Sequence, residues 1–286
     1  MSLNHAFHRM ELLTGSYTLN QLAKTRVILF GVGGVGSWCA EGLIRSGVKN
    51  LTIVDSDLVC VTNINRQVQA TSKTLGCVKV TELARRLREI SADAQITTIQ
   101  KIYDNDTRES FNLSDYDYVI DAIDSLTSKV TLLESALKAK TTVYSALGAS
   151  CKLDPTRIKV SSIWDSYGCR LGKLVRKRLR RRGVRGDFKC VWSDEVLPVY
   201  AIESGCGTGE CFCPKSIRGE EDEEAFIHEW CSSKKQINGS AVHITATYGF
   251  MLSGLIIQDV VKRFPTEHTL PSPAATTDKD PLFKQT

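Results

Sequence analysis

The stretch RVILFGVGGVGSW (residues 26–38) decides the fold of this chain. Its start, RVILF, is apolar enough for a buried β-strand, and a glycine-rich turn follows directly. The turn fits the pattern G-x-G-x-x-G, in which glycines permit a tight turn and a close approach of backbone N–H groups to phosphate. A strand, this turn and a helix in succession therefore predict a nucleotide-binding site. The glycines of the turn are Gly31, Gly33, Gly34 and Gly36.

Strand and helix patterns alternate along the residues that follow. The strands are apolar on both faces, which is typical of a parallel sheet covered by helices on both sides. The sequence therefore predicts an α/β fold, a Rossmann-like, doubly wound and mostly parallel sheet. Strand patterns cover residues 26–31, 50–55, 94–100, 116–121 and 141–147, and helix patterns cover 34–46, 78–90 and 126–139.

The regular alternation ends near Gly148, and a C-terminal α+β extension follows. Short strand patterns occur there (RIKVSSIW and FKCVW), together with a basic segment, a cysteine-rich loop and a closing helix at about 241–263. The proline-rich end of the chain is expected to be disordered. We divide the chain into an N-terminal arm (1–25), a nucleotide-binding core (26–150), a substrate-binding extension (151–263) and a tail (264–286).

The composition favours a globular protein of the cytoplasm. The chain has 286 residues, 42% of them hydrophobic, and a net charge of +5. The N-terminus shows no signal-peptide pattern, and ten cysteines without such a signal argue for reduced thiols. The closing helix is the most apolar segment, but His243, Gln258 and Asp259 interrupt it, so we expect a buried helix and no membrane span.

The residues after the second predicted strand distinguish between nucleotides. Asp55 ends that strand, where an acid binds ribose hydroxyls. NAD would need this acid and then mostly apolar contacts, whereas Arg66 and Lys79 suit a polyphosphate. Asp124 follows the strand YDYVID at the carboxyl edge of the predicted sheet, where a carboxylate facing a triphosphate is a natural Mg²⁺ ligand. ATP with Mg²⁺ is therefore expected, at a site that also includes Asp57, Asn63 and Gln67.

These motifs resemble the ubiquitin-activating-enzyme-like (ThiF/MoeB-type) adenylyltransferases. The resemblance is carried by GVGGVGSW, DSDLVCVTNINRQ, Lys79 and DAID, and it covers about residues 7–150. The strings FHRMELLTG, SALGASCKLDPTRIKV and ATYGF are similar to the branch of the family that modifies tRNA. This resemblance implies ATP-dependent dehydration of N6-threonylcarbamoyladenosine in tRNA to its cyclic form, through adenylation of the threonyl carboxylate.

The resemblance also implies a role for each matching residue. Asp55 would hold the ribose, and Asp124 the metal ion. Arg9 stands where relatives have an arginine that reaches the phosphates of a partner subunit, which implies a homodimer. The family further implies a cysteine desulfurase or sulfur-acceptor system as a partner. The triphosphate would be held by Asn63, Arg66 and Lys79, with Gln67 in support.

A basic segment after the core is the candidate tRNA contact. Nine Lys or Arg residues and no acid lie between Arg170 and Arg185. Apolar residues recur between them at helical spacing, so one stripe is expected to pack inward while the cations face solvent. Three nearby aromatic residues either belong to the core or stack on anticodon-loop bases. The apolar stripe is Leu171, Leu174, Val175 and Leu179, the tRNA-binding candidates are Lys173, Arg176, Lys177, Arg180, Arg181 and Arg182, and the aromatic residues are Trp164, Tyr167 and Trp192.

Two other functions stay open on the sequence alone. The same ATP site would serve an adenylyltransferase acting on the C-terminal glycine of a ubiquitin-like sulfur carrier, and a non-catalytic nucleotide sensor would share the fold. Cys206, Cys211, Cys213 and Cys231 lack the paired C-x-x-C spacing of a zinc site, so metal binding there is undecided. A thioester-forming cysteine, Cys190 or Cys206, is a further alternative.

Overall fold

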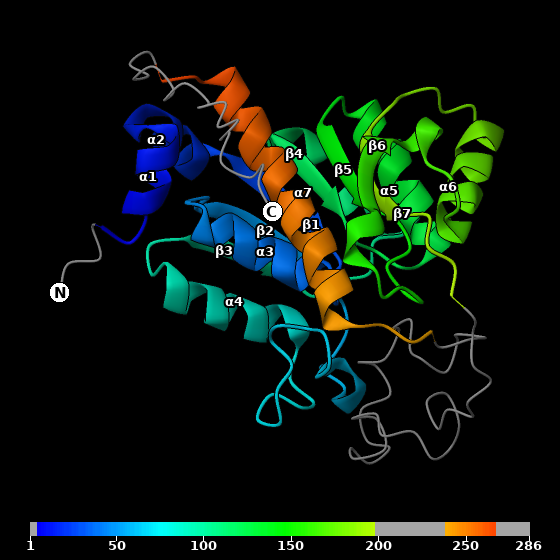
Figure 1. Ribbon diagram of the computed structural model, residues 1–286, viewed down its shortest axis with the longest axis horizontal. Helices are drawn as coiled ribbons and strands as arrows, with labels where there is room; N and C mark the ends of the chain where they lie inside the picture. Colours follow the sequence, from blue (N-terminus) through cyan, green and yellow to red (C-terminus); the bar gives the residue numbers. More distant parts are fainter. Residues whose placement is uncertain (1–4, 198–237, 267–286) are drawn as a thin grey trace, which may run out of the picture.

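A seven-stranded sheet forms the centre of the molecule in the computed structural model, which describes residues 5–197 and 238–266 (Figure 1). The strand order is β3-β2-β1-β4-β5-β7-β6, and every neighbouring pair is parallel except β7 and β6. This confirms the predicted mostly parallel sheet. The strands are β1 (Arg26–Phe30), β2 (Asn50–Val54), β3 (Gln95–Ile99), β4 (Tyr118–Asp121), β5 (Thr142–Ala146), β6 (Ile158–Ser162) and β7 (Lys189–Ser193).

Helices cover both faces of the sheet, as the doubly apolar strands predict. One face packs against α3, α4 and α7, and the other packs against α5 and α6. Alternate residues of β1 show the division, since Val27 and Leu29 belong to the first core while Ile28 and Phe30 belong to the second. The helices are α1 (His8–Thr14), α2 (Ser16–Lys24), α3 (Gly36–Arg45), α4 (Lys79–Ile90), α5 (Leu126–Lys138), α6 (Arg170–Arg181) and α7 (Val242–Arg263).

The closing helix α7 crosses directly over α3 (Figure 1). Glycines allow this close crossing, because a Cβ on Gly249 would lie 2.5 Å from the Val35 carbonyl oxygen and one on Gly42 would lie 2.6 Å from Ser253 Oγ. By length and composition α7 is apolar enough to cross a membrane. Its most apolar window is 56% buried inside the protein, which confirms the expected buried helix.

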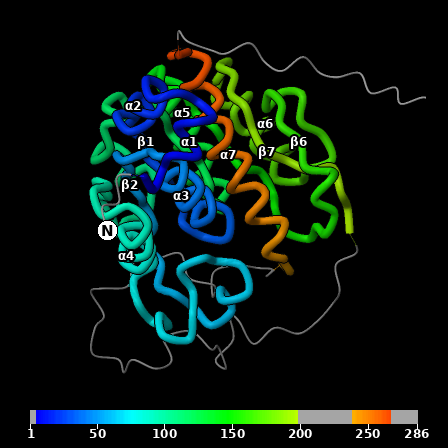
Figure 2. The backbone as a smooth tube through the Cα atoms, turned by 60° about the vertical axis from the view of Figure 1, so that its left-hand side comes forward, coloured from blue at the N-terminus to red at the C-terminus, as the bar shows by residue number. Residues whose placement is uncertain are grey.

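The N-terminal helices lie at the C-terminal end of α7, away from its first turn (Figure 2). Thr18 Oγ1 of α2 donates a hydrogen bond to the Phe264 carbonyl at 2.7 Å. At the other end of α7, Thr245 lies beside the glycine turn, since a Cβ on Gly34 would come within 3.2 Å of it. These two contacts are nineteen residue steps apart along α7, which is about 30 Å.

The chain order places a ligand site between β1 and β4. From β1 the chain builds outward through β2 to β3, then crosses back to β4 on the other side of β1. Loops from the two strands diverge there at the carboxyl edge, which is where open α/β sheets bind ligands. The glycine turn and the segment containing Asp124 follow these two strands.

Candidate active site

Two positions in the glycine turn leave no room for another residue type. Gly31 has φ +85°, a left-handed conformation that favours glycine. A Cβ on Gly36 would lie 1.8 Å from the Gly31 carbonyl oxygen, so no side chain fits at the start of α3. These two positions confirm the turn that the sequence pattern predicts.

Gly33 gives the test of whether a phosphate group fits here. Its φ is not in the left-handed range, and the nearest atom to a Cβ there would be Gln67 Nε2 at 3.8 Å. The fold itself would therefore tolerate a side chain, but the side chain would fill the space above the N-terminus of α3. Open space lined by backbone N–H groups at a helix N-terminus suits phosphate oxygens. The residues present thus fit a nucleotide.

Asp55 is fixed by two backbone hydrogen bonds at the end of β2. Its Oδ2 accepts from the Val32 N–H at 2.7 Å, and its Oδ1 accepts from the Asp57 N–H at 2.9 Å. The carboxylate therefore joins the glycine turn to the loop after β2. This is the position from which an acid reaches ribose hydroxyls in nucleotide-binding sheets.

Lys79 is a buried cation, only 6% exposed, at the first turn of α4. Its Nζ donates to Asp57 Oδ2 at 2.6 Å. Burial alone would lower the pKa of Lys79, but the carboxylates of Asp55 and Asp57 raise it above the ordinary value, and Asp124 adds to this effect. The structure thus brings together Lys79 and all three acids that the sequence assigned to the site.

Arg66 lies next to the glycine turn, since a Cβ on Gly34 would meet its Cγ at 3.2 Å. Trp38 Nε1 donates to the Arg66 carbonyl at 3.0 Å and ties its loop to α3. Asn63 is buried, and its Oδ1 accepts from the Cys60 N–H at 3.1 Å, so it also holds the loop in shape. Of the predicted phosphate-binding residues, Arg66 and Gln67 therefore lie beside the turn. Arg9 lies elsewhere, because α1 is at one side of the molecule, away from the first turn of α7 (Figure 1).

A buried ion pair beneath the site was missed in the sequence analysis. Lys129 and Asp121 are both fully buried, and Lys129 Nζ donates to Asp121 Oδ2 at 2.6 Å and to the Ala146 carbonyl at 2.9 Å. Ser145 Oγ donates to the same carboxylate oxygen. Asp121 Oδ1 accepts from the Ile123 N–H at 3.1 Å, so the pair shapes the turn that carries Asp124.

A signal for this pair is present in the sequence. Lys129 falls on the same face of the predicted helix 126–139 as Leu133 and Ala136, one turn and two turns further on. A lysine on an apolar helical face needs a buried partner or a route to solvent. The acid that ends strand β4 is the available partner.

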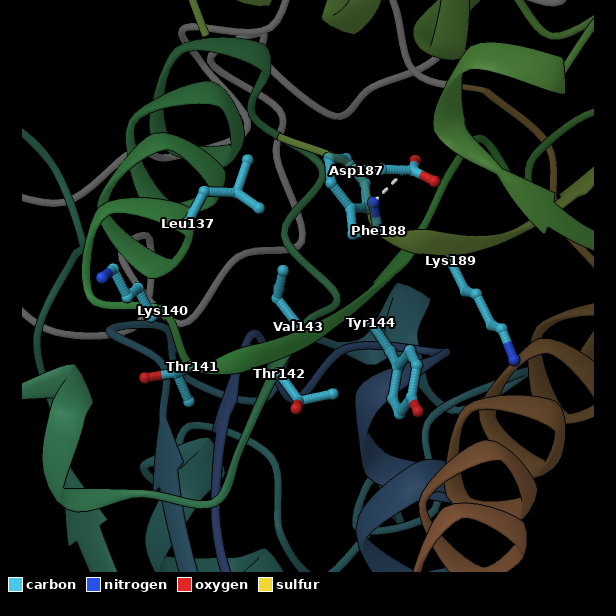
Figure 3. Close-up of a pocket in the computed structure, with 9 residues that line it drawn as sticks. All are labelled: Leu137, Lys140, Thr141, Thr142, Val143, Tyr144, Asp187, Phe188 and Lys189. Carbon is cyan, nitrogen blue, oxygen red and sulfur yellow. Dashed lines mark hydrogen bonds between the residues drawn. The ribbon is translucent and has the colours of Figure 1, made fainter. Parts of the chain in front are cut away.

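A hollow of about 350 Å³ opens at the opposite edge of the sheet (Figure 3). It lies between the end of α5 and the amino ends of β5 and β7, and Leu137, Tyr144 and Phe188 are among its lining residues. The glycine turn is at the carboxyl edge, so this hollow is separate from the candidate active site.

The basic segment forms α6, as predicted, but two of its six tRNA-binding candidates are engaged within the protein. Arg176 Nη1 donates to Ser166 Oγ, so its side chain binds the preceding loop. Arg182 Nη1 forms an ion pair with Glu134 Oε2 at 2.8 Å. Leu174 was expected to pack inward and is instead 37% exposed, whereas Val175 and Leu179 are buried. The other four candidates, Lys173, Lys177, Arg180 and Arg181, are exposed, as is the paired Arg182.

The aromatic residues and cysteines near α6 separate clearly by burial. Trp192 is 2% exposed and belongs to the core, Trp164 is half-buried beneath the Arg180 guanidinium, and Tyr167 is exposed. Cys190 is fully buried, which raises the pKa of its thiol to about 12 and does not suit a thioester-forming nucleophile. The sequence left metal binding open for four further cysteines. These lie outside the described residues: Cys206, Cys211, Cys213 and Cys231.

The chain is similar to known proteins over most of its length. Residues 7–277 match the ThiF family. The tRNA threonylcarbamoyladenosine dehydratase of Bacillus subtilis (strain 168) is 33% identical over 259 residues, which is 90% of this chain and 95% of that protein. The Escherichia coli enzyme TcdA, a tRNA N6-threonylcarbamoyladenosine dehydratase, superimposes with TM-scores of 0.75 in its AMP complex and 0.73 in its ATP complex, at 28% identity over 91% of this chain and 95% of TcdA.

Proposed function

The chain belongs to the ThiF family, and on that premise we propose that it dehydrates N6-threonylcarbamoyladenosine in tRNA in an ATP-dependent reaction. The observation that carries this conclusion is the extent of the match. It covers 90% of the chain, so it includes the extension after residue 150 as well as the ATP-binding half. A sulfur-carrier adenylyltransferase would share the ATP site, but the exposed cations of α6 suit a nucleic acid.

The chemistry explains why ATP is needed. A carboxylate is a poor electrophile because oxide would have to leave. An oxygen of the substrate's threonyl carboxylate attacks the α-phosphorus of ATP, which releases pyrophosphate and leaves an acyl-adenylate. A nitrogen of the neighbouring urea group then bonds to the activated carbonyl carbon, gives up its proton and displaces AMP. The ring closure is intramolecular, so a high effective concentration supplies much of its rate.

Cationic residues of this chain reduce charge repulsion during adenylation. An anionic carboxylate must approach a triphosphate, and nearby cations reduce their repulsion. Lys79 keeps its charge because three acids surround it, and its buried position fixes it in place. Arg66 lies beside the glycine turn on a loop held by Trp38. These contacts set the cations in position before the substrate arrives.

Mg²⁺ is the metal ion that the site would take. Asp124 is exposed at the carboxyl edge, close enough to Lys79 for its charge to affect the lysine pKa. An exposed carboxylate beside a triphosphate site matches the oxygen ligands that Mg²⁺ prefers. Bound there, the ion would neutralise phosphate charge in the transition state. Asp124 is accordingly proposed as its protein ligand.

The proposal includes a homodimer in which Arg9 acts on the partner's site. Arg9 is exposed on α1, and α1 contacts α2 at the end of α7 remote from the glycine turn. That end of α7 is about 30 Å from the turn, farther than an arginine side chain extends, which argues against Arg9 serving the ATP site of its own subunit. This supports a role across an interface. The cytoplasmic location and the sulfur-system partner stay predictions.

Mixing two inactive variants tests the shared site. Arg9→Ala and Asp124→Ala subunits, unfolded together and refolded, should form heterodimers that hold one intact site each. Random pairing makes half of the dimers mixed, so about a quarter of wild-type activity should return. The control is the same treatment of each variant alone. Activity that stays at the level of the separate variants would contradict the shared site.

Nucleoside mass analysis tests the reaction itself. The purified protein is incubated with Mg-ATP and tRNA that carries N6-threonylcarbamoyladenosine, and the tRNA is digested under mild, near-neutral conditions. The expected result is an ATP-dependent loss of one water from that nucleoside. No such loss, together with pyrophosphate release that requires a carrier protein ending in Gly-Gly, would instead establish the sulfur-carrier function.

A further inference from the structure

Tyr167 presents a fixed aromatic ring to solvent just before α6. Its side chain is 55% exposed, yet it is held at two points. Lys159 Nζ donates to the phenol oxygen at 2.7 Å, and the ring meets the Trp192 indole edge to face, with centroids 4.6 Å apart. Trp192 is itself buried and donates from Nε1 to Ser161 Oγ at 2.9 Å. The ring therefore rests on the core and needs little further ordering to bind a ligand.

Cations border this ring. Lys159 and Arg157 both bind Asp194, at 2.8 Å and 2.9 Å, and these contacts hold the pKa of Asp194 well below its usual range. Asp194 neutralises one of the two, so the cluster keeps one net positive charge. Beyond Tyr167, the first turn of α6 adds exposed Arg170 and Lys173.

Three further acids lower this positive charge, because Asp154 and Glu195 lie near Arg157 and Asp165 lies near the ring. Asp165 is exposed two residues before the ring, and α6 itself contains no acid. Among the residues that contact the ring or adjoin it in the sequence, the cations Lys159, Arg170 and Lys173 outnumber Asp165. A half-exposed aromatic ring among cations suits a base and its phosphates better than an apolar protein surface.

The ring lies on the same edge of the sheet as the ATP site. β6 is antiparallel to β7, so Ile158 is paired with Ser193 at the carboxyl end of β7. Three strand spacings separate β7 from β1, which is about 14 Å. This separation is of the size of a nucleotide or two of single-stranded RNA.

A series of residue contacts connects the two places. Gly34 of the glycine turn lies against Thr245 in the first turn of α7. One step away on the same turn, a ring nitrogen of His243 forms a hydrogen bond with the Leu153 carbonyl oxygen at 2.9 Å. The segment from Leu153 then leads to Arg157, whose guanidinium pairs with Asp194 beside Lys159.

We infer that Tyr167 is a stacking platform for an unpaired base adjacent to the modified adenosine in the anticodon loop. Arg170 and Lys173 bind the phosphates on either side of that base. The platform fixes the loop while the threonyl carboxylate of the modified nucleotide reaches the ATP site. This inference rests on the proposed function and adds to it a residue that selects single-stranded RNA at this distance from the ATP.

A pair of substitutions at Tyr167 tests the platform. Tyr167→Leu removes the ring, and Tyr167→Phe keeps it without the hydroxyl. The ligand is an anticodon stem-loop RNA that carries N6-threonylcarbamoyladenosine, with 2-aminopurine placed on the 5′ or the 3′ side of it. Wild type and Tyr167→Phe should quench one of the two probes by stacking. Tyr167→Leu should lose this quenching and bind the RNA about tenfold more weakly, since one stacked base is lost.

Two controls separate stacking from other effects. Tyr17→Leu removes a ring of similar exposure, 52%, from α2 at the far end of the molecule, and it should leave RNA affinity unchanged. ATP affinity should be equal in all variants. The slope of log affinity against log salt should not change in Tyr167→Leu, because no phosphate contact is removed.

The outcomes distinguish the platform from the proposed function. If the wild type dehydrates the nucleoside while Tyr167→Leu matches it in RNA affinity and in quenching, the platform is overturned and the function stands. If the wild type neither binds the RNA nor dehydrates the nucleoside, both fall. Loss of quenching in Tyr167→Leu, with quenching kept in Tyr167→Phe, establishes the platform.

Discussion

The ATP site and the basic helix α6 both carry many charges, but they hold them differently. At the ATP site, Lys79 and Lys129 are buried, and each binds a carboxylate at 2.6 Å. On α6, Lys173, Lys177 and Arg181 are exposed to solvent. The difference teaches that a site for one small ligand fixes its charges in advance. A surface for a long polyanion needs only their number and sign.

The same contrast exists within α6. Arg176 and Arg182 are used by the protein to bind Ser166 and Glu134, which anchors the helix on its loop and on α5. The cations that remain on the outer face are then available to a ligand. Charge density in the sequence therefore overstates the number of phosphate contacts that the helix offers.

The largest expected effect is at the ATP site. Asp124→Ala should abolish ATP turnover, with a loss of about a hundredfold or more, because the Mg²⁺ proposed to neutralise phosphate charge would lose its proposed ligand. The side chain is exposed, so the fold should stay intact. Pyrophosphate release by the purified variant and its thermal unfolding temperature measure the two quantities. Unchanged turnover would remove Asp124 from the site.

Breaking a buried ion pair should lower the free energy of unfolding more than breaking an exposed one. Lys129→Met leaves the Asp121 carboxylate buried without its cation, and such losses cost about 3–5 kcal/mol in the free energy of unfolding. Arg182→Ala breaks the partly exposed pair with Glu134, where about 1 kcal/mol or less is expected. Urea titration of both variants measures the comparison. Equal losses of unfolding free energy in the two variants would contradict the distinction between buried and exposed charges.

The smallest expected effects are single charge removals on α6. Each of Lys173→Ala, Lys177→Ala and Arg181→Ala should weaken tRNA binding a few-fold and reduce the slope of log affinity against log salt by about 1. Arg176→Ala should leave that slope unchanged, because its side chain binds Ser166. Filter-binding titrations at several salt concentrations give the slopes. A slope reduced by about 1 in Arg176→Ala would show that Arg176 also contacts phosphate.

Local patterns made most of the fold predictable. The apolar strands and the helices between them follow from periodicity, and the glycine turn follows from the steric demands at Gly31 and Gly36. The position of β6 could not be read in this way. It pairs antiparallel with β7, which comes later in the chain, so its place depends on contacts between distant residues.

The site was predictable where chemistry and spacing coincide. Asp55, Lys79 and Asp124 are charged residues after strands or at a helix start, and the parallel sheet brings their loops together. The inward turn of Arg176 was not predictable, since it depends on the loop that carries Ser166. The Lys129–Asp121 pair needed both the helix face and the strand end to be considered together.

The crossing of α7 over α3 has a consequence for how this protein is made. A ribosome completes the glycine turn and α3 more than 190 residues before it reaches α7. Until then the face of α3 that packs on α7, which includes Gly42, is left uncovered. Contacts between such distant segments also slow folding. The nascent ATP-binding half is therefore expected to depend on chaperones until translation is nearly complete.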